Sequence, residues 1–454
     1  MKTEVMIVLD TNAVVTKSLA FQQYVERAAG KFAIVLENGV QYAVLKEEKV
    51  KGVSLDEIRS IAGEVGRALQ AQSADAATIG AALFANDEEV TAFVEGWHLG
   101  QYAFDKYVSE KANPVVPLTV EGGNEDAVKL GEVRAQSMSL SRDLMNELSN
   151  VLNPETFPEV LKEHFAGTKV DVTVLSKEEI EERQMNGVLT VGRGSKYEPR
   201  FVELTYRAND EKPLVALVGK GVTFDTGGIS LKSGADLSDM RMDMGGAAAV
   251  TGALNLLAQT EADVNVVGLI PMVENAPDNT SVYPGEIIEY KNGVTVQVGN
   301  TDAEGRLILA DGLIRADELE ADYIVDIATL TGAIHNALGD KIGGVFAGDE
   351  ELAVQMKRLG EENGDFVWPM PLVDAYDAGL KSDYADLLNI STLGFGGSIT
   401  AALFLRNFVK NPSTWAHVDM AGTMEASKAE GYYAKSATGY GARLLADYAV
   451  SVSK

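Results

Sequence analysis

Short apolar runs alternate with helix-like patterns through the second half of the chain, and this alternation constrains the fold more than any other feature. The runs are PLVALVG (213–219), VNVVGLIPMV (264–273) and YIVDIATLT (323–331). Strands buried on both faces of a parallel sheet have such nearly continuous apolar sequences. A helical pattern rich in small residues, GGAAAVTGALNLLAQ (245–259), lies between two of them. This order predicts an α/β fold with a mostly parallel or mixed sheet flanked by helices, which binds ligands beyond the carboxyl ends of its strands.

The first third of the chain predicts a second, smaller α/β domain, because 454 residues are too many for one compact core. Its signals are a strand from Val5, a hairpin turn at Asn38-Gly39, a capping box at Ser54 and Glu57 that opens a helix to about residue 71, and helices that begin at Asn86 and Asn124. Asn153-Pro154 predicts a new helix with proline at its first position. We therefore place the domain junction near residue 150.

Charge and composition exclude several classes of protein. The net charge of −28 repels phosphate backbones, so nucleic-acid binding is not expected. The absence of cysteine excludes disulfides, thiolate metal sites and cysteine nucleophiles. No apolar stretch reaches the roughly 18 residues of a membrane span, and the N-terminus does not resemble a signal peptide. We expect a cytoplasmic protein.

Two segments contain several side chains that could take part in catalysis or metal binding. The first, GKGVTFDTGGISLKSGADLSDMRMDMGG from Gly219, follows a predicted strand and contains Lys220, Asp225, Lys232 and Asp243. The second, NTDAEGRL from Asn300, contains Asp302, Glu304 and Arg306 and precedes a helical pattern. The spacing i, i+2, i+4 predicts that these last three side chains leave one face of an extended segment. The glycine between Glu304 and Arg306 predicts close approach of another group.

The charges of the two segments indicate a metal site if the segments meet. Asp225, Asp243, Asp302 and Glu304 cannot all stay ionised in one pocket without cations, and two divalent ions would balance four carboxylates. Oxygen-rich sites suit Mg²⁺, Mn²⁺ or Zn²⁺. None of the four histidines lies in either segment, which disfavours a histidine-based site. Taken alone, these residues leave open a solvated surface pattern as the alternative.

The two segments resemble the signatures of the leucine aminopeptidase family, the cytosol aminopeptidases. The likeness extends over roughly residues 140–454, through MVENAPDN, YPGE and WAHVDMAG. It implies a catalytic metallo-aminopeptidase domain at 151–454, beside an N-terminal α/β domain (1–150) with a role in oligomerisation or regulation. The implied site consists of the metal ligands Lys220, Asp225, Asp243, Asp302 and Glu304 and the catalytic residues Lys232 and Arg306.

The resemblance also implies a mechanism. Asp225 and Glu304 would bridge the two metal ions. Asp302 would complete the coordination shell of one ion, and Asp243 with a neutral Lys220 would complete that of the other. A water shared by the metals would attack the peptide carbonyl, with Lys232 stabilising the oxyanion. A bicarbonate on Arg306, near Ala303, Gly305 and Leu330, would shuttle protons. The substrate's free amine would bind the metal held by Lys220, which would explain removal of N-terminal residues.

Finer expectations follow from the same resemblance. Met240, Thr329 and Gly332 would line an apolar pocket that favours Leu or Met ends, and a homohexamer is the usual assembly. His417 and Asp419 are interpreted as structural support. Leu148 and the VYPGE turn depart from the usual family pattern and leave substrate preference open.

Two other classes of function stay open beside the peptidase. One is a DNA-linked binding or regulatory protein on the same scaffold, which the net charge disfavours. The other is a two-metal phosphoesterase, which the scarcity of histidine disfavours.

Overall fold

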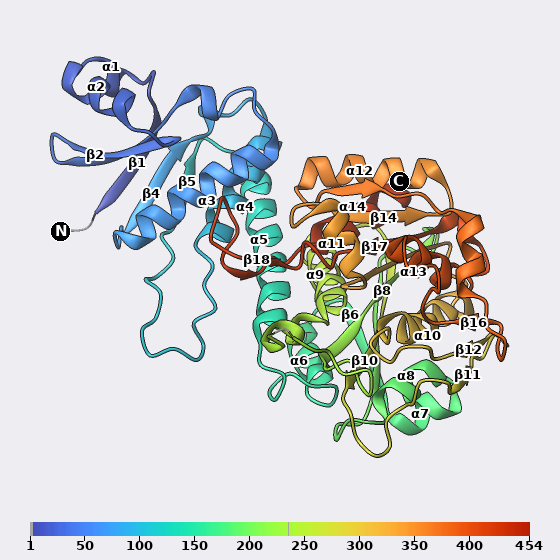
Figure 1. Cartoon of the computed structure of the whole chain (residues 1–454). Coiled ribbons are helices and arrows are strands. Elements are labelled where there is room, and N and C mark those ends of the chain that lie inside the picture. The colour runs from blue at the N-terminus through green and yellow to red at the C-terminus, as the bar shows by residue number, and fades with distance from the viewer. Residues whose placement is uncertain (1–2, 235) are drawn as a thin grey trace. The chain divides into compact units, whose positions relative to one another are not determined.

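The chain folds into two compact units. The computed structural model describes residues 3–234 and 236–454 (Figure 1). The first unit comprises residues up to Ser139 together with Ala426–Ser436, and the second comprises Leu140–Glu425 and Ala437–Lys454. The division falls inside helix α5 (Glu125–Asn146) rather than near residue 150, because this helix continues past the boundary without a break. The return of 426–436 to the first unit was not predicted.

The first unit is a small α/β domain, as predicted. Its elements are β1 (Glu4–Leu9), α1 (Ala13–Thr16), α2 (Leu19–Arg27), β2 (Phe32–Glu37), β3 (Val40–Leu45), α3 (Leu55–Ala71), β4 (Ala76–Gly80), α4 (Asp87–Gly100) and β5 (Leu118–Glu121). The strand order is β2-β3-β1-β4-β5, with β2 and β3 forming the hairpin around Asn38-Gly39. The capping box at Ser54 and Glu57 is present at the start of α3. The predicted hairpin and helix starts of this unit are confirmed.

Helices α3 and α4 of the first unit pack with almost no space between their backbones. A Cβ atom at Gly96 would lie 2.1 Å from the carbonyl oxygen of Arg59. We therefore expect Gly96→Ala to lower the free energy of unfolding by about 2 kcal/mol, since overpacking of this kind outweighs the helix-propensity gain. Urea unfolding, followed by hydrogen exchange of α3 and α4, measures the change.

Gly80→Ala is the matched control for this substitution, because a Cβ atom there would meet only Leu83 Cδ1 at 3.8 Å. Equal unfolding midpoints for the two variants would contradict the close packing of α3 on α4.

The second unit is larger and contains a mixed sheet. Its elements are α6 (Phe157–Phe165), β6 (Val170–Leu175), α7 (Lys177–Glu182), α8 (Asn186–Gly192), β7 (Arg200–Arg207), β8 (Leu214–Gly219), β9 (Gly221–Asp225), α9 (Gly245–Gln259), β10 (Asn265–Asn275), β11 (Ile287–Glu289), β12 (Thr295–Gln297), α10 (Gly305–Glu318), β13 (Tyr323–Ala328), α11 (Gly332–Leu338), β14 (Gly343–Ala347), α12 (Glu350–Asn363), β15 (Val367–Pro369), β16 (Leu387–Leu388), α13 (Gly397–Arg406), β17 (Trp415–Asp419) and α14 (Ala442–Val452). Two short strands, β18 (Glu425–Ala426) and β19 (Ser436–Ala437), complete the description.

The three apolar runs of the sequence form central strands of this sheet. The order is β15-β14-β17-β13-β8-β10-β7-β6, and β17, β13, β8 and β10 are parallel to one another. The strands β7 and β14 pair antiparallel with their inner neighbours β10 and β17. The predicted mixed, mostly parallel α/β sheet is therefore confirmed.

Helices cover both faces of the sheet (Figure 1). Gly312 in α10 lies against Val218, with a hypothetical Cβ atom 2.4 Å from Val218 Cγ1, whereas Gly219 faces Gly246 of α9. Val218 and Gly219 are consecutive residues of β8 and point to opposite faces. Small residues thus let both helices approach the strands, and those of α9 belong to the GGAAAV sequence at its start.

One predicted helix start is wrong. Helix α6 begins at Phe157, not at Asn153-Pro154, and Pro158 lies in its first turn. The Asn153 side chain instead accepts hydrogen bonds from the Glu155 and Thr156 amides, at 3.0 and 3.2 Å, and so caps a turn before the helix. Among the described residues, no helix combines the length and apolar character needed to cross a membrane.

Candidate metal centre

The residues of the two sequence segments lie at the carboxyl edge of the central strands. Lys220 directly follows β8, and Asp225 ends β9. Thr329 follows β13, whose Ile327 is level with Gly219 in the neighbouring strand. Because parallel strands end at the same edge, residues distant in the sequence meet there.

A tight turn after β9 brings Asp225 toward the second segment. Gly227 and Gly228 have φ values of 89° and 63°, which favour glycine. Asp225 Oδ1 accepts hydrogen bonds from the Gly227 amide and from Asn275 Nδ2, both at 2.8 Å. A Cβ atom at Gly227 would lie 2.9 Å from Asp302 Oδ1, so the turn also permits contact between the segments.

The second segment is not extended, contrary to the prediction. Helix α10 already begins at Gly305, and Glu304 occupies the position before it with helical φ and ψ of −77° and −34°. Asp302, Glu304 and Arg306 therefore do not share the face of a strand. The period-two argument failed because it could not locate the start of the helix. The group that approaches Gly305 is Lys220, whose Cε would lie 2.5 Å from an added Cβ atom.

The acidic side chains nevertheless gather in one place. Oxygen atoms of Asp225, Asp302 and Glu304 lie within 4.8 Å of one another. Lys232 Nζ contacts Asp225 Oδ2 at 2.8 Å and Asp302 Oδ1 at 2.5 Å.

Asp243 joins this group through Lys220. Lys220 Nζ contacts Asp243 Oδ1 at 2.7 Å and Glu304 Oε1 at 2.9 Å, and donates to the Thr329 carbonyl at 2.9 Å. The five predicted ligands and Lys232 thus form one connected cluster.

Burial and mutual repulsion raise the pKa values of three carboxyls in this cluster. Burial, reinforced by Asp225, raises the pKa of Glu304 to about 8. Burial also raises the pKa of Asp243 to about 6, and it raises the pKa of Asp302. Among the described residues, the ion pairs of this cluster join four carboxyls to two ammonium groups, so two of the four carboxylate charges are not matched by these lysines.

The two lysines respond in the opposite direction. Burial lowers the pKa of Lys220, but the carboxylates of Asp243, Glu304 and Asp225 raise it by more, so the net shift is upward. Burial likewise opposes the charge of Lys232, and Asp225 and Asp302 again raise its pKa above the ordinary value. The raised pKa values favour the ammonium form of both side chains.

The donor atoms fit divalent metal ions. Asp243 Oδ2 and Glu304 Oε2 are buried and have no hydrogen-bond partner among the described residues. Such oxygens are costly to bury unless something satisfies them. Hard carboxylate oxygens in a cluster of excess negative charge suit Mg²⁺, Mn²⁺ or Zn²⁺.

Arg306 lies beside this cluster in the first turn of α10. Burial lowers its pKa to about 10, although Glu304 and Asp419 favour its charge. Its Nη1 donates to the Asn389 carbonyl at 2.8 Å, while its buried Nε has no hydrogen-bond partner in the part of the chain that the structure describes. Of the backbone groups predicted near a bicarbonate, the Leu330 amide donates to Asp419 Oδ1 at 3.2 Å. Ala303 and Gly305 flank Glu304.

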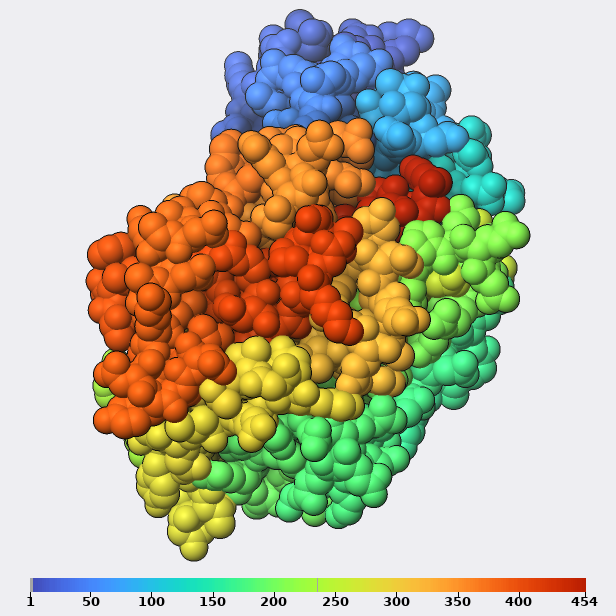
Figure 2. Space-filling view, turned by 90° about the vertical axis from the view of Figure 1, so that its right-hand side faces the viewer, coloured from blue at the N-terminus to red at the C-terminus, as the bar shows by residue number. Residues whose placement is uncertain are grey.

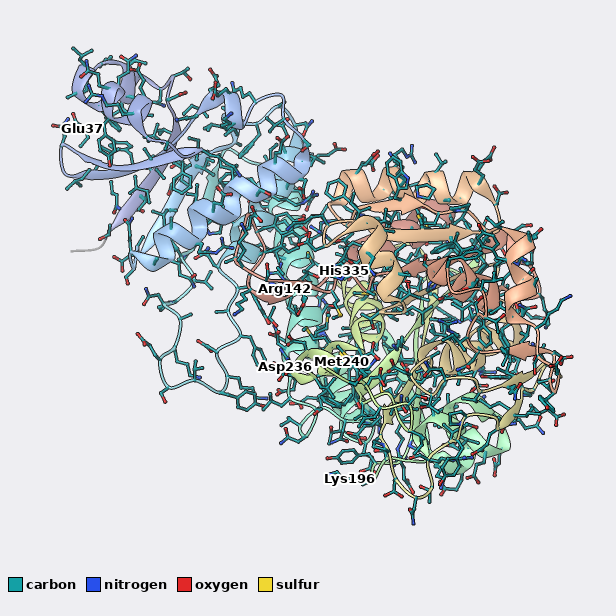
Figure 3. The ribbon with its side chains drawn as sticks, viewed as in Figure 1. Glu37, Arg142, Lys196, Asp236, Met240 and His335 are labelled. Carbon is teal, nitrogen blue, oxygen red and sulfur yellow. The ribbon has the colours of Figure 1, made fainter. Side chains whose placement is uncertain are left out.

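The three predicted pocket residues differ in surroundings. Met240 is half-buried in a 3₁₀ helix (Ser238–Met242) on the segment between β9 and α9 that also contains Asp236 (Figure 3). The Thr329 hydroxyl donates to Asp243 Oδ1 at 2.7 Å, so it orients a predicted ligand. Gly332 is exposed at the start of α11, with open space where a Cβ atom would lie.

His417 and Asp419 connect β17 to β13 and to the residues that follow β13. His417 Nδ1 lies 2.5 Å from Asp326 Oδ1, and both side chains are buried. Asp419 accepts from the Leu330, Thr331 and Ala421 amides and from the Thr331 hydroxyl. These contacts are consistent with the interpretation of both residues as structural support.

Asn275 and Thr301 support the site but were missed by the sequence argument. Asn275 Nδ2 donates to Asp225 Oδ1 at 2.8 Å and to the Thr301 carbonyl at 3.0 Å. The Thr301 hydroxyl donates to the Gly227 carbonyl and accepts from the Ser230 amide. Only the position of Asn275 at the end of an apolar strand could have indicated it.

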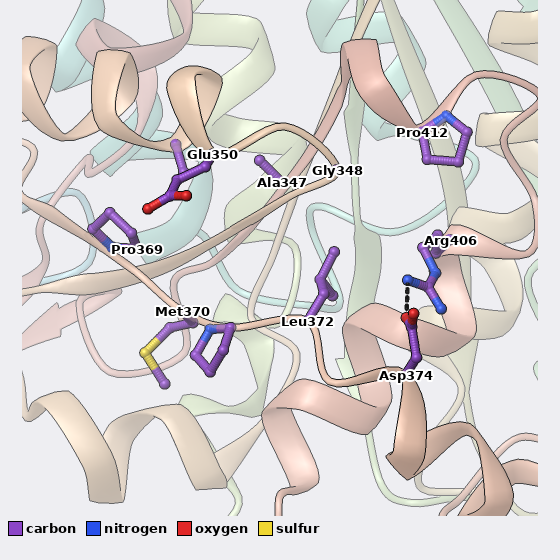
Figure 4. A pocket seen from close by; sticks show the side chains of 11 residues that line it. Ala347, Gly348, Glu350, Pro369, Met370, Leu372, Asp374, Arg406 and Pro412 are labelled. Carbon is purple, nitrogen blue, oxygen red and sulfur yellow. Dashed lines mark hydrogen bonds and ion pairs between the residues drawn. The ribbon is translucent and has the colours of Figure 1, made fainter.

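Two of the cavities lined by described residues lie outside this cluster. One, of about 970 Å³, is lined by residues that include Glu350, Met370 and Leu372, with Arg406 paired to Asp374 (Figure 4). The other, of about 340 Å³, is lined by residues that include Lys291, Glu318 and Phe408. Figure 2 shows one face of the molecule with the chain coloured by residue number. Neither contains a predicted site residue.

A carboxylate-rich cluster at the carboxyl edge of a helix-covered sheet is the kind of site that metallohydrolases use. Comparison with known proteins then gives the family. Residues 139–446 match the model described as the cytosol aminopeptidase family, catalytic domain. A probable cytosol aminopeptidase of Persephonella marina is 41% identical over 369 residues, which covers 80% of this chain and 74% of that protein. One from Rickettsia bellii is 39% identical over 435 residues, covering 91% and 86%.

A solved structure supports the same assignment. The bottromycin maturation enzyme BotP in complex with Mn is similar over the whole of both chains, with a TM-score of 0.92 and 31% identity. The chain belongs to the cytosol aminopeptidase family and is a metal-dependent aminopeptidase that acts on peptides. These matches support neither the DNA-linked protein nor the phosphoesterase.

Proposed function

We propose that this chain removes N-terminal residues from peptides with a free α-amine, using two divalent ions per subunit. Asp225 and Glu304 would be shared by both ions, Asp302 would complete one coordination shell, and Lys220 with Asp243 would complete the other. The observation that carries this proposal is the gathering of three carboxylates within 4.8 Å, flanked by Lys220 and Lys232. When bound, the ions supply Lewis-acid activation of water and of the scissile carbonyl.

The residues around the ligands have separate tasks in this proposal. Lys232 would present an ammonium group to the oxyanion that develops on the carbonyl oxygen. Arg306 would hold a bicarbonate beside Glu304, close to the backbone of Ala303, Gly305 and Leu330, and the bicarbonate would move protons. The buried, half-satisfied guanidinium of Arg306 supports an anion partner at this place.

The finer properties are also proposals. Met240, Thr329 and Gly332 would form the pocket for the first side chain and favour Leu or Met. The ions would be Mn²⁺ or Zn²⁺, with Mg²⁺ as the third candidate, and the Mn complex of the structurally similar enzyme supports Mn²⁺. We also propose a cytoplasmic homohexamer, in which the N-terminal unit has an assembly or regulatory role.

Hydrolysis of leucine p-nitroanilide tests the proposed function. With added Mn²⁺ we expect turnover of this substrate and none of N-acetyl-leucine p-nitroanilide, which lacks the free amine. Equal rates for the two substrates would contradict exopeptidase action, and turnover only of p-nitrophenyl phosphate would replace it with phosphoesterase action.

Metal affinity should rise with pH. Burial raises the pKa of Glu304 to about 8, so its carboxyl holds a proton through most of the range from pH 6 to 8 and must lose it when an ion binds. Asp243, with a pKa raised to about 6, competes in this way only near the lower end of the range. Lys220 must also lose a proton to become a ligand. Between pH 6 and 8 we expect the Mn²⁺ association constant to increase at least about tenfold per pH unit.

Calorimetry of Mn²⁺ binding in two buffers with different ionisation enthalpies measures both the affinity and the protons released. An affinity that does not change with pH, without proton release, would rule out this competition.

A further inference from the structure

Asn389 lies beside the metal centre although it belongs to neither sequence segment. It directly follows β16, which pairs in parallel with β12, Val296 opposite Leu387 and Gln297 opposite Leu388. Its amide donates to the Gln297 carbonyl at 3.1 Å and continues this pairing. The residue is fully buried, at 0% exposure, so water cannot replace a lost hydrogen bond.

The carboxamide of Asn389 is saturated by the backbone of the second segment. Its Oδ1 accepts from the Gly299 and Asn300 amides, at 2.7 and 3.2 Å. Its Nδ2 donates to the Asn300 carbonyl at 2.7 Å and to the Ala303 carbonyl at 3.3 Å. Only an amide offers two acceptor and two donor positions in this geometry. One side chain thus fixes the backbone on both sides of Asp302.

The backbone of Asn389 also fixes Arg306. The Asn389 carbonyl accepts from Arg306 Nη1 at 2.8 Å. The same residue therefore determines where the Asp302–Glu304 backbone lies and where the guanidinium lies relative to it. A shift of Asn389 would therefore move the Asp302 and Glu304 carboxylates and the Arg306 guanidinium together.

We propose that Asn389 is a positioning residue for the reaction, which sets the spacing between the Asp302 and Glu304 carboxylates and the Arg306 guanidinium. The inference rests on the proposed function for its catalytic consequence, but its effect on ligand geometry is independent of the substrate. Partners that orient ligands in this way commonly contribute 10- to 100-fold in metal affinity or activity.

Asn265 provides a matched control elsewhere in the second unit. It is 2% exposed, at the start of β10, the end of this strand opposite to the site. Its Oδ1 accepts from the Ala208 and Asn209 amides, and its Nδ2 donates to the Asn209 and Lys212 carbonyls. Asn265→Asp therefore breaks the same kinds of bond as Asn389→Asp without touching the site.

The test compares Mn²⁺ affinity, melting temperature and kcat for Asn389→Asp and Asn265→Asp. A carboxylate cannot donate to the Asn300 and Ala303 carbonyls, so we expect Asn389→Asp to lower Mn²⁺ affinity or kcat by about 10- to 100-fold. Asn265→Asp should lower the melting temperature comparably, with Mn²⁺ affinity and kcat within about twofold of wild type. Asn389→Ser, which keeps one donor and one acceptor, should show a smaller loss and serves if the aspartate variant does not fold.

Wild-type Mn²⁺ affinity and kcat in a folded Asn389 variant would overturn the positioning role, even if its melting temperature fell. Equal losses in Mn²⁺ affinity for the two asparagine variants would overturn it as well. If wild type hydrolyses no aminoacyl substrate, the proposed function fails instead, and Mn²⁺ affinity alone still decides the role of Asn389.

Discussion

Glu304→Gln should lower kcat for leucine p-nitroanilide about 1,000-fold and reduce the bound metal below two ions per chain. The substitution keeps the volume of the side chain but removes the carboxylate that lies both within 4.8 Å of Asp225 and Asp302 and 2.9 Å from Lys220. A shared ligand affects both ions, and the loss of about 4 kcal/mol of transition-state stabilisation corresponds to this factor. Turnover and metal content by elemental analysis are measured on the same sample.

Glu203→Gln is the control for this variant. Glu203 is a buried carboxylate in β7 that pairs with Arg315 at 2.8 Å, away from the site. We expect wild-type kcat and metal content for it, whatever its stability. A Glu304→Gln enzyme that keeps full activity and both ions would remove Glu304 from its assigned role.

Lys232→Met should lower kcat about 100-fold while the bound metal remains. In the structure the ammonium group of Lys232 lies between Asp225 and Asp302, at 2.8 and 2.5 Å. Removal of one preorganised donor to a developing oxyanion typically costs 10²- to 10³-fold in kcat. The substitution removes a cation and no ligand, so the metal content should equal that of wild type.

A lower kcat with unchanged metal content would distinguish Lys232 from the proposed metal ligands, whose substitution should lower both quantities. Lys212→Met is the control, since Lys212 donates to the Ser453 carbonyl at 2.6 Å and lies away from the site. Loss of metal in Lys232→Met would show that Lys232 is needed for metal binding, and unchanged kcat would exclude it from the reaction.

The fold could be predicted where one physical requirement dominates. The apolar runs that became β8, β10 and β13 must be buried on both faces, and a run of this kind fits few positions other than the centre of a sheet. The helix starts at Ser54 and Asn86 were predictable for a similar reason, because each cap satisfies local backbone groups.

Predictions failed where a local sequence is compatible with two different backbone structures. The polar side chain of Asn153 can cap a helix or a turn, and in the structure it caps the turn before α6. The spacing of Asp302, Glu304 and Arg306 suits a strand face, but the helix that begins at Gly305 overrides it. The return of 426–436 to the first unit depends on packing between distant parts of the chain, which no local pattern records.

The candidate metal centre could likewise be predicted from the local sequence only in part. Its acidic residues stand in two dense segments, so composition and charge balance could indicate them. The groups that hold those segments, Asn275, Thr301 and Asn389, are single polar residues in ordinary surroundings. Their importance lies in hydrogen bonds across 26 to 89 residues of sequence, which only the fold creates.

Anomalous scattering from crystals grown with Mn²⁺ tests the central claim most directly. We predict two peaks in each chain, both in contact with Asp225 and Glu304, one also near Asp302 and the other also near Lys220 and Asp243. A single peak away from these carboxylates, or none at saturating Mn²⁺, would contradict the two-ion centre.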